Sequence, residues 1–391
     1  MACIGSTVVA LLAGGAVVEH RATTSWAAME THGATMRADF DRRDHRRDAL
    51  WGDNTDGAAF AEYARAAALA KPLSGQDHLE LVATLRRTDA EIAAETVELR
   101  ARWRPALEAM RAGAHRRDVR PPAVCGEDPN AGVSNLLLAR WITNVAMFEA
   151  RALRQAGQHR EAVEWTLDAM TFGADHVRNG VLINQMIGLA LVAIATSETW
   201  SDAALHRLDR PALDLLAAGL ARLDAQLPWH LDLTADLLWL ADSLAHPPGE
   251  GYGVGSATAW RYGFSAKWMT ADAFAHYAAT MERLADSRQL AWSKHQASMN
   301  AEMTALANSS NPMLSLMAPN VTAAESNLRQ TLARIRLLRA AVGLLRGDDI
   351  SRLRDPLGDG MLKVTREGDL TYVRSVGVPN GRSFERCVER R

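Results

Sequence analysis

The opening segment, MACIGSTVVALLAGGAVVEH, constrains this chain more than any other stretch of its sequence. The run from Ala2 to Val18 carries no charge, and as a helix it would extend roughly 26 Å, close to the thickness of a membrane's hydrocarbon core. Its only hydroxyl residues are Ser6 and Thr7, so it lacks the polar face of a helix in a soluble bundle. We therefore expect residues 1–20 to be a hydrophobic anchor. A cleaved signal is the second interpretation, and a buried soluble helix is the third.

The basic residues near this segment give a conflicting indication of membrane orientation. They follow the apolar run instead of preceding it, and by the positive-inside tendency they would keep the body of the chain in the cytoplasm. The orientation of the chain and the cleavage of residues 1–20 are therefore left open by the sequence. The residues concerned are Arg21, Arg37, Arg42, Arg43, Arg46 and Arg47.

The overall composition excludes two broad classes of protein. Hydrophobic residues make up 48% of the chain and charged residues 23%, which is typical of a folded globular protein and not of a disordered one. The net charge is -2, so no basic field attracts the chain to a polyanion. We expect a folded body and no nucleic-acid partner.

Helical periodicity dominates the sequence and predicts a mainly α protein: an N-terminal hydrophobic helix, a multi-helix bundle and a small C-terminal β-hairpin. Residues 21–120 are interpreted as a stalk and helical arm, 130–347 as the main helical body, and 348–391 as a small β tail. A Pro-rich loop at 116–132 separates the arm from the body. The expected helices in the arm and body are 57–70, 77–111 with a kink or division at Pro105, 211–226, 229–245, 257–286 and 289–308.

Two further helices at the start of the main body are predicted to form a hairpin. Apolar residues recur at helical spacing from Leu138 to Ala152, and Gly157 closes the first helix before a second begins near Gln158. Ala152 and Ala162 allow close packing of an antiparallel pair. The segment resembles a single tetratricopeptide-type hairpin of roughly 34 residues. No second copy is evident, so a solenoid is not expected.

Two later helices are expected to lie in the core. Residues 180–197 are also uncharged, but the amphipathic helices on either side favour a central helix buried on all sides over a membrane span. The last long helix is predicted to begin with a capping box of Thr322 and Glu325. Its apolar stripe is expected to face the core of the protein in preference to a partner. That stripe consists of Leu328, Leu332, Ile335, Leu338, Val342 and Leu345.

The helical period is lost after residue 354, where two strand-like runs flank residues 366–369 and predict a hairpin. This tail resembles the C-terminal end of type II secretion pseudopilins, which carry Asp-Pro-aromatic-Gly and later Tyr-Ser-x-Gly-x-Asp/Asn-Gly. Leu357 stands in place of the aromatic residue, Arg374 stands in place of Tyr, and the acidic residues of the family's calcium loop are missing. The matching positions are Asp355, Pro356, Gly358, Ser375, Gly377, Asn380 and Gly381.

The resemblance implies a location and not a chemistry. Bacterial membrane-anchored proteins with a helical middle and a pseudopilin-like tail have their bodies exported, which opposes the charge tendency described above. In an oxidising compartment Cys125 and Cys387 could form a disulfide between the loop and the tail, whereas two free thiols are the equal alternative.

Motifs for catalysis are not found. The glycine-rich segment 249–256 follows a predicted helix and lacks a lysine, so it is interpreted as an interhelical loop and not a phosphate loop. Pairs at i,i+4 such as Asp272 and His276 share helix faces, but HExxH, Cys-x-x-Cys and G-x-S-x-G are absent. We expect no cofactor and no metal, and the sequence gives an enzyme no positive support.

These observations favour an anchored, exported, non-enzymatic scaffold or interaction protein. Its expected location is the bacterial inner membrane, as a single-pass protein with its body in the periplasm. It would contact the membrane through its N-terminal helix and bind protein partners of the cell envelope, in the setting of a secretion or pilus-like system. A cytosolic helical adaptor is the first alternative. An enzyme with an unrecognised site, formed by several of Asp232, Asp236, Asp272 and His276, is the second.

Overall fold

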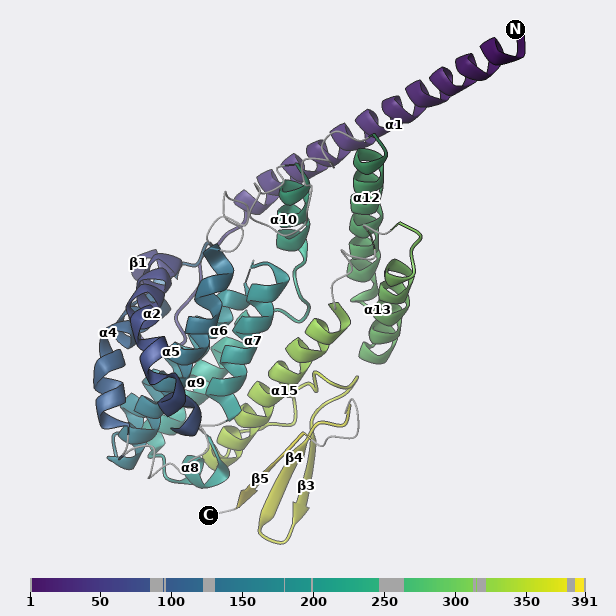
Figure 1. Ribbon diagram of the computed structural model, residues 1–391. Helices are drawn as coiled ribbons and strands as arrows, with labels where there is room; N and C mark the ends of the chain where they lie inside the picture. The colour runs from purple at the N-terminus through teal and green to yellow at the C-terminus, as the bar shows by residue number, and fades with distance from the viewer. Residues whose placement is uncertain are drawn as a thin grey trace. The chain divides into compact units, whose positions relative to one another are not determined.

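The computed structural model describes residues 2–84, 94, 96–121, 131–178, 180–197, 200–245, 264–311, 314, 321–377 and 384–389. The chain is mainly helical, with a small sheet near its C-terminus, which confirms the predicted class (Figure 1). It divides into two compact units, and each unit is discontinuous in sequence. Unit 1 contains residues 1–43, 123–129 and 233–322, and unit 2 contains 44–122, 130–232 and 323–391. This partition does not follow the linear division into arm, body and tail.

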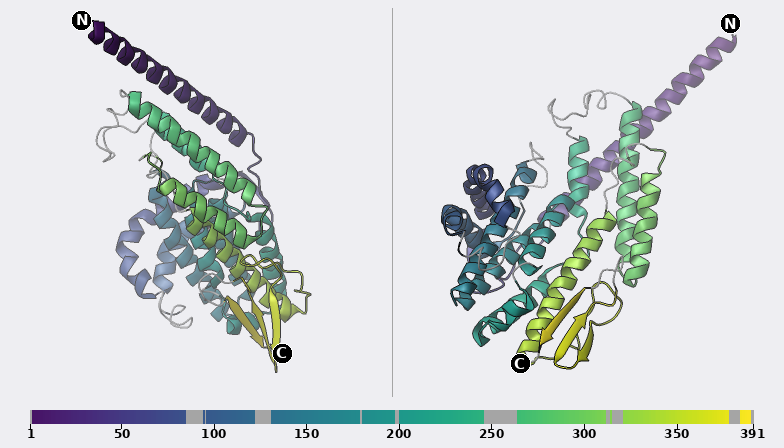
Figure 2. Two further views of the ribbon diagram at one scale, coloured as in Figure 1. Left: turned by 90° about the vertical axis from the view of Figure 1, so that its right-hand side faces the viewer. Right: turned by 60° about the horizontal axis from the view of Figure 1, so that its bottom comes forward.

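Unit 1 consists of long helices that pack side by side. Helix α1 is continuous through the expected stalk and contacts α10 and α12, and α12 pairs with α13 (Figures 1 and 2). An ion pair between Arg283 Nη2 and Glu302 Oε2 at 2.8 Å joins α12 to α13. The bounds are α1 Ala2–Asp41, α10 Thr234–Ala245, α12 Phe264–Ser287 and α13 Trp292–Ala307.

The N-terminal run is helical, as expected, but the side chains of its first eighteen residues lie outside those that the structure describes. Within the described part of the chain, no helix combines the length and the apolar character needed to cross a membrane.

Unit 2 contains the remaining helices and both sheets. A short parallel pair joins β1 to β2, and the C-terminal sheet is antiparallel in the order β3-β4-β5. The helices are α2 Ala59–Thr84, α4 Val97–Ala114, α5 Ala131–Gln155, α6 His159–Val177, α7 Leu182–Ser197, α8 Asp202–His206, α9 Arg210–Gln226 and α15 Val321–Arg346. The strands are β1 Thr55–Ala58, β2 Arg116–Asp118, β3 Lys363–Glu367, β4 Leu370–Arg374 and β5 Glu385–Glu389.

Prolines interrupt the helices of unit 2 less than the sequence predicts. Helix α2 continues through Pro72 to Thr84, so the end expected for the helix 57–70, just before Pro72, is wrong. The continuation is held by Asp77, whose carboxylate accepts hydrogen bonds from Trp103 Nε1 at 2.7 Å and Arg102 Nη2 at 2.9 Å. The single helix expected over 77–111 is also wrong, because Thr96 is the N-cap of a separate helix, α4, which begins at Val97. Helix α4 then runs undivided through Pro105.

The predicted hairpin at the start of the main body consists of α5 and α6. Gly157 has φ of +77°, a left-handed conformation that suits glycine in the turn between two helices. Val145, on the predicted apolar face of the first helix, is fully buried, as are Val163 and Trp165 of α6. The two helices contact one another and the turn reverses the chain between them.

Helices α6 and α7 cross so closely that glycine is required on both. A Cβ atom on Gly188 would lie 2.5 Å from the carbonyl oxygen of Gly173 and 2.7 Å from the amide nitrogen of Val177. We expect Gly188→Ala to lower the free energy of unfolding by about 1–3 kcal/mol, because the helices must separate to admit the methyl group. Gly360→Ala is the matched control, since no atom lies within 4 Å of its added Cβ. Urea titration of both variants measures the difference, and equal stabilities would contradict the close crossing.

Helix α15 packs against the C-terminal sheet. The prediction that its apolar stripe faces the core is confirmed. Leu337 and Ala340 form a buried cluster with Leu362 and Val373 of the tail, and the second view of Figure 2 shows the sheet beside α15. Of the predicted stripe, the five residues that precede Leu345 are fully buried.

The capping box predicted for the start of α15 is wrong. Thr322 lies inside the helix, and the carboxylate of Glu325 instead accepts a hydrogen bond from the amide nitrogen of Leu231 at 2.9 Å.

The β tail begins with the predicted hairpin and gains a third strand. Strands β3 and β4 pair in register from Lys363 opposite Arg374 to Glu367 opposite Leu370, around a turn in which Gly368 has φ of +63°. Strand β5 then pairs with β4, which makes β4 the central strand. The third strand was not expected, because ERCVE shows no clear alternation of polar and apolar residues.

Candidate functional site: an apolar groove and the tail cluster

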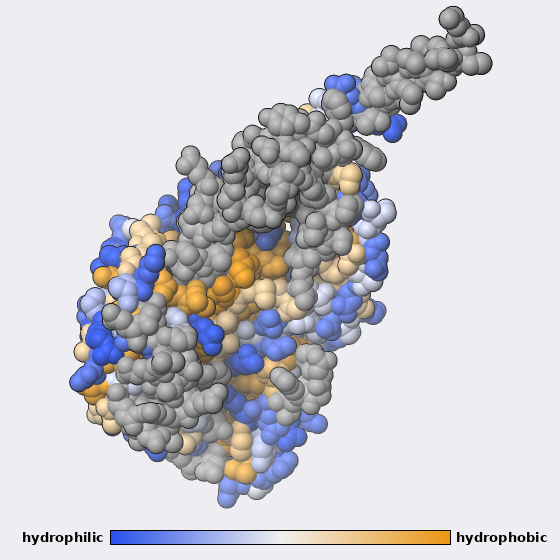
Figure 3. Space-filling view, viewed as in Figure 1, coloured by the Kyte–Doolittle hydropathy of each residue, from blue (hydrophilic) through white to orange (hydrophobic). Residues whose placement is uncertain are grey.

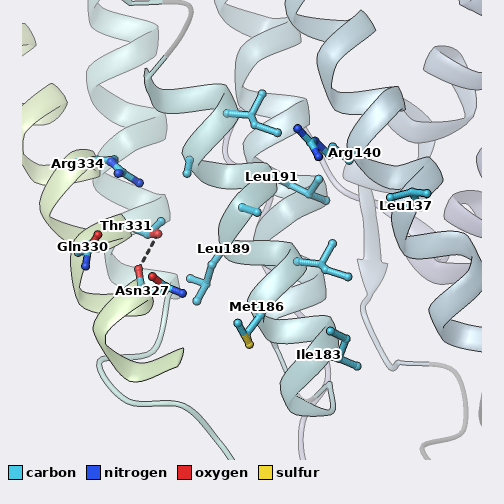
Figure 4. A pocket seen from close by; sticks show the side chains of 14 residues that line it. Leu137, Arg140, Ile183, Met186, Leu189, Leu191, Asn327, Gln330, Thr331 and Arg334 are labelled. Carbon is cyan, nitrogen blue, oxygen red and sulfur yellow. Dashed lines mark hydrogen bonds between the residues drawn. The ribbon is translucent and has the colours of Figure 1, made fainter. Parts of the chain in front are cut away.

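A groove with a volume of about 650 Å³ lies between α5, α7 and α15 of unit 2. Figure 4 shows α7 along its length, with α15 on one side and α5 on the other. The wall formed by α5 and α7 is almost entirely apolar, and Figure 3 shows apolar residues gathered over α7. We refer to this feature as the groove. Its apolar lining consists of Leu137, Ile183, Met186, Ile187, Leu189, Ala190, Leu191, Ala193 and Ile194.

The exposed part of α7 corrects the prediction that this helix is buried on all sides. Leu191 and Val192 are fully buried against the bundle, but the side chain of Ile183 is 44% exposed. Leu137 on α5 is 65% exposed. Water therefore covers large aliphatic side chains at the edge of the groove, at a cost of roughly 25 cal/mol for each Å² of apolar surface. An apolar groove edged by exposed aliphatic side chains is a candidate binding site.

The opposite wall, on α15, is polar and contributes a positive charge. Asn327 and Gln330 line the groove, and their carboxamides bond to no other side chain among the described residues. Arg334 on α15 and Arg140 on α5 flank the groove from opposite sides, near the end of α7 that holds Leu191 (Figure 4). Burial lowers the pKa of Arg334.

Neither arginine is neutralised within the part of the chain that the structure describes. The Cζ atom of Arg334 lies 5.4 Å from the ring centroid of Phe384, and the Cζ atom of Arg140 lies 5.9 Å from that of Trp141. These ring contacts leave the guanidinium N–H groups free to bind a carboxylate. The groove therefore combines an apolar surface with two arginines that suit an anionic group.

The second candidate feature is the tail cluster, formed by Asp355, Gly358, Ser375 and Gly377. Asp355 is 1% exposed, and its carboxylate accepts hydrogen bonds from Ser375 Oγ at 2.7 Å and from the amide nitrogens of Val376 at 2.6 Å and Gly377 at 3.2 Å. A Cβ atom on Gly377 would lie 1.6 Å from the carbonyl oxygen of Leu357, so only glycine fits there. The cluster therefore closes the loop before β3 onto the end of β4.

The structure brings together four of the seven positions that carry the pseudopilin resemblance. A fifth, Pro356, lies beside them, with its carbonyl oxygen 3.5 Å from Arg329 Nη1. Asn380 and Gly381 lie outside the described residues, as does Cys125. Cys387 is a half-buried free thiol in β5, opposite Tyr372.

Two carboxylates on α6 are buried, a role that the sequence did not predict: Asp168 was noted there only as an i,i+4 partner of Glu164, and Asp175 was not singled out. Asp175 is 0% exposed and accepts hydrogen bonds from Arg47 Nε at 2.7 Å and from the hydroxyl of Tyr63 at 2.5 Å. Asp168 is 1% exposed and accepts bonds from Trp51 Nε1 and Arg111 Nε, both at 2.7 Å. These four partners come from the loop after residue 43, from α2 or from α4. The two carboxylates therefore fasten these segments to α6, and this role is structural.

His115 makes the hydrogen bonds around Asp168 sensitive to pH. Its Nε2 lies 3.1 Å from Asp168 Oδ1, and this hydrogen bond raises the pKa of His115 above its ordinary value of 6.5. A raised pKa in the folded state stabilises the protein below about pH 6.5, and this contribution is lost as the pH rises through the folded pKa.

We expect His115→Gln to destabilise the protein more near pH 5.5 than near pH 8.5, as measured by urea titration at both values. His176 acts in the opposite direction, because burial lowers its pKa, but it is present in both proteins and cancels in the comparison. A difference in stability that is the same at both values of pH would contradict the role given to His115.

Of the four residues proposed for an unrecognised enzyme site, Asp272 and His276 are explained by local bonding, while Asp232 belongs to unit 2 and Asp236 to unit 1. Asp272 lies on α12 beside a hollow of about 400 Å³ between α12 and α1. Its carboxylate accepts a hydrogen bond from Asn311 Nδ2 at 3.1 Å, and His276 Nδ1 lies 2.9 Å from its backbone carbonyl oxygen. Segment 249–256 lies outside the described residues.

The fold and the groove together define a mainly helical protein with a small β tail and an open, arginine-flanked apolar surface. The chain matches no protein-family model, no curated protein and no solved structure. The function is therefore argued from the groove and from the chain's own sequence.

Proposed function

We propose that this chain is a non-enzymatic interaction protein that binds a partner polypeptide in the groove. The observation that carries the proposal is the exposure of Leu137 and Ile183 on a helical scaffold, beside two arginines without carboxylate partners among the described residues. Aliphatic side chains of this size gain about 1.5–3 kcal/mol each when they are buried. That range holds for a fully exposed side chain, so a partner that covers the groove would recover the share that matches the exposed fraction, 65% for Leu137 and 44% for Ile183.

The experiment is site-specific photocrosslinking in the cells that produce the protein. A photoreactive phenylalanine replaces Ile187 in the groove, and the same residue replaces Ala218 on the exposed side of α9 as the control. We expect a covalent adduct with a second polypeptide from position 187 and none from position 218. Equal adducts from both positions, or none from position 187, would overturn the proposal.

The proposal places the protein at the cell envelope, anchored by residues 1–20 with its body exported. The uncharged N-terminal run supports an anchor, and the convergence of Asp355, Ser375 and Gly377 in one cluster supports a tail of the pseudopilin kind. That resemblance favours the setting of a secretion or pilus-like system. The hairpin of α5 and α6, which resembles a tetratricopeptide unit, is consistent with a scaffold role.

A cytosolic helical adaptor is the second candidate, and the basic residues between Arg21 and Arg47 favour it. Alkaline phosphatase fused after residue 50 distinguishes the two locations, because the enzyme is active only outside the inner membrane. We expect phosphatase activity from this fusion. An inactive fusion, with a β-galactosidase fusion at the same position active, would support the cytosolic adaptor.

A further inference from the structure

We propose that the groove accepts an amphipathic helix of a partner protein, about three turns long, with carboxylates at the end that reaches Arg140 and Arg334. This inference rests on the proposed function, and it names the chemistry of the partner. The contacts that α7 offers extend from Ile183 to Ile194. At 1.5 Å per residue this is roughly 16 Å, the length of three helical turns.

The openness of the groove favours a helix over a lipid chain. An acyl chain needs a site that encloses most of its surface, because all of that surface is apolar. Leu137 is 65% exposed and Ile183 is 44% exposed, so the groove would leave much of an acyl chain in water. An amphipathic helix buries only one stripe and keeps its polar face hydrated, which matches an open groove between helices.

The two walls match the two parts of such a helix. The apolar wall of α7 presents Ile183, Ile187 and Ile194, which can receive aliphatic side chains at i, i+3, i+4 and i+7. The polar wall on α15 presents Asn327 and Gln330, whose carboxamides can donate and accept hydrogen bonds at the edge of the bound helix.

Charge determines which helix fits. Arg140 and Arg334 stand on opposite walls near one end of the groove, and no carboxylate in the described part of the chain pairs with either (Figure 4). Closing the groove would remove water from Arg334, which is already half buried, and this costs free energy unless a carboxylate replaces the water. A helix with lysines at that end would be repelled.

Binding of two synthetic helical peptides to the full chain tests this inference. Both are three to four turns long and share one leucine stripe, but one carries glutamates and the other lysines at one end. We expect fluorescence anisotropy to show that the glutamate peptide binds about tenfold more tightly or better. Arg140→Glu should abolish or reverse this preference. Arg207→Glu, at an exposed position outside the groove, is the matched control and should leave it unchanged.

The outcomes separate this inference from the proposed function. Equal binding of both peptides, or a preference that survives Arg140→Glu, would overturn the acidic helix. If sodium dodecanoate binds and neither peptide does, the groove is a lipid site, and the proposal of an acidic helix is overturned. If neither peptide binds but the crosslink from position 187 persists, the acidic helix fails while the proposed function stands. Failure of both experiments would contradict both proposals.

Discussion

Replacing Asp175 with alanine is expected to lower the free energy of unfolding by about 3–5 kcal/mol, the cost of leaving a buried charge without its partner. The side chains of Arg47 and Asp175 are only 1% and 0% exposed. Arg47 Nη2 also donates to the carbonyl oxygen of Gly113 at 3.1 Å, so the guanidinium cannot turn to solvent without breaking contacts with α4. Urea unfolding monitored by tryptophan fluorescence measures the loss.

Two variants identify the cause of that loss. Glu164→Gln removes a carboxylate from the same helix, but its partner Arg160 is 65% exposed, so we expect a change of less than about 1 kcal/mol. Replacing both members of the buried pair, as Arg47→Met with Asp175→Leu, should recover much of the stability, because no unpaired charge remains. A double variant as unstable as Asp175→Ala would contradict the ionic explanation and indicate a packing defect.

Replacing Asp355 with alanine is the second large effect expected, about 3–5 kcal/mol, localised to the β tail. Its carboxylate satisfies the backbone amides of Leu357, Val376 and Gly377, and each buried donor left without an acceptor costs about 1–3 kcal/mol. Hydrogen exchange measures the result. The amides of β4, from Leu370 to Arg374, should lose protection while those of α6 keep theirs.

The control for this variant is Asp369→Ala, which removes an exposed carboxylate from the β3–β4 turn and should leave exchange in β4 nearly unchanged. We expect Asp355→Asn to cause an intermediate loss of protection in β4, because an amide retains one of the two acceptor oxygens. If β4 kept its protection in Asp355→Ala, the tail cluster would not be what holds the loop to the sheet.

The sequence predicts helices best where periodicity alone determines them. The expected helix 211–226 appears as Arg210–Gln226, and the hairpin around Gly368 appears as predicted. The errors arise from contacts between residues distant in sequence. Pro72 does not end α2, because Asp77 bonds to α4 beyond it, and Glu325 does not cap its own helix, because it bonds to Leu231. A local sequence window contains neither partner.

The candidate site shows the same limitation. Asp168 and Asp175 lie seven residues apart on an amphipathic helix. The sequence alone predicts that such carboxylates face solvent, because their bonding partners lie in distant segments. The uncharged α7 indicates burial, and one of its faces is buried. That its other face remains open depends on where α5 and α15 lie, and no feature of residues 180–197 encodes this. In the tail, by contrast, Asp355, Gly358, Ser375 and Gly377 already form a pattern in the sequence, although their contacts become visible only in the structure.

The most direct test of the central claim, that the groove is an open surface for another polypeptide, is the yield of the crosslink from position 187 in a chain that also carries Ile183→Asp. Ile183 is 44% exposed, so this charge should cost less than about 1 kcal/mol of stability but should repel an apolar partner. We predict a folded protein that has lost the crosslink. An unchanged crosslink in the folded variant, or a loss of several kcal/mol that places Ile183 in the core, would contradict the account.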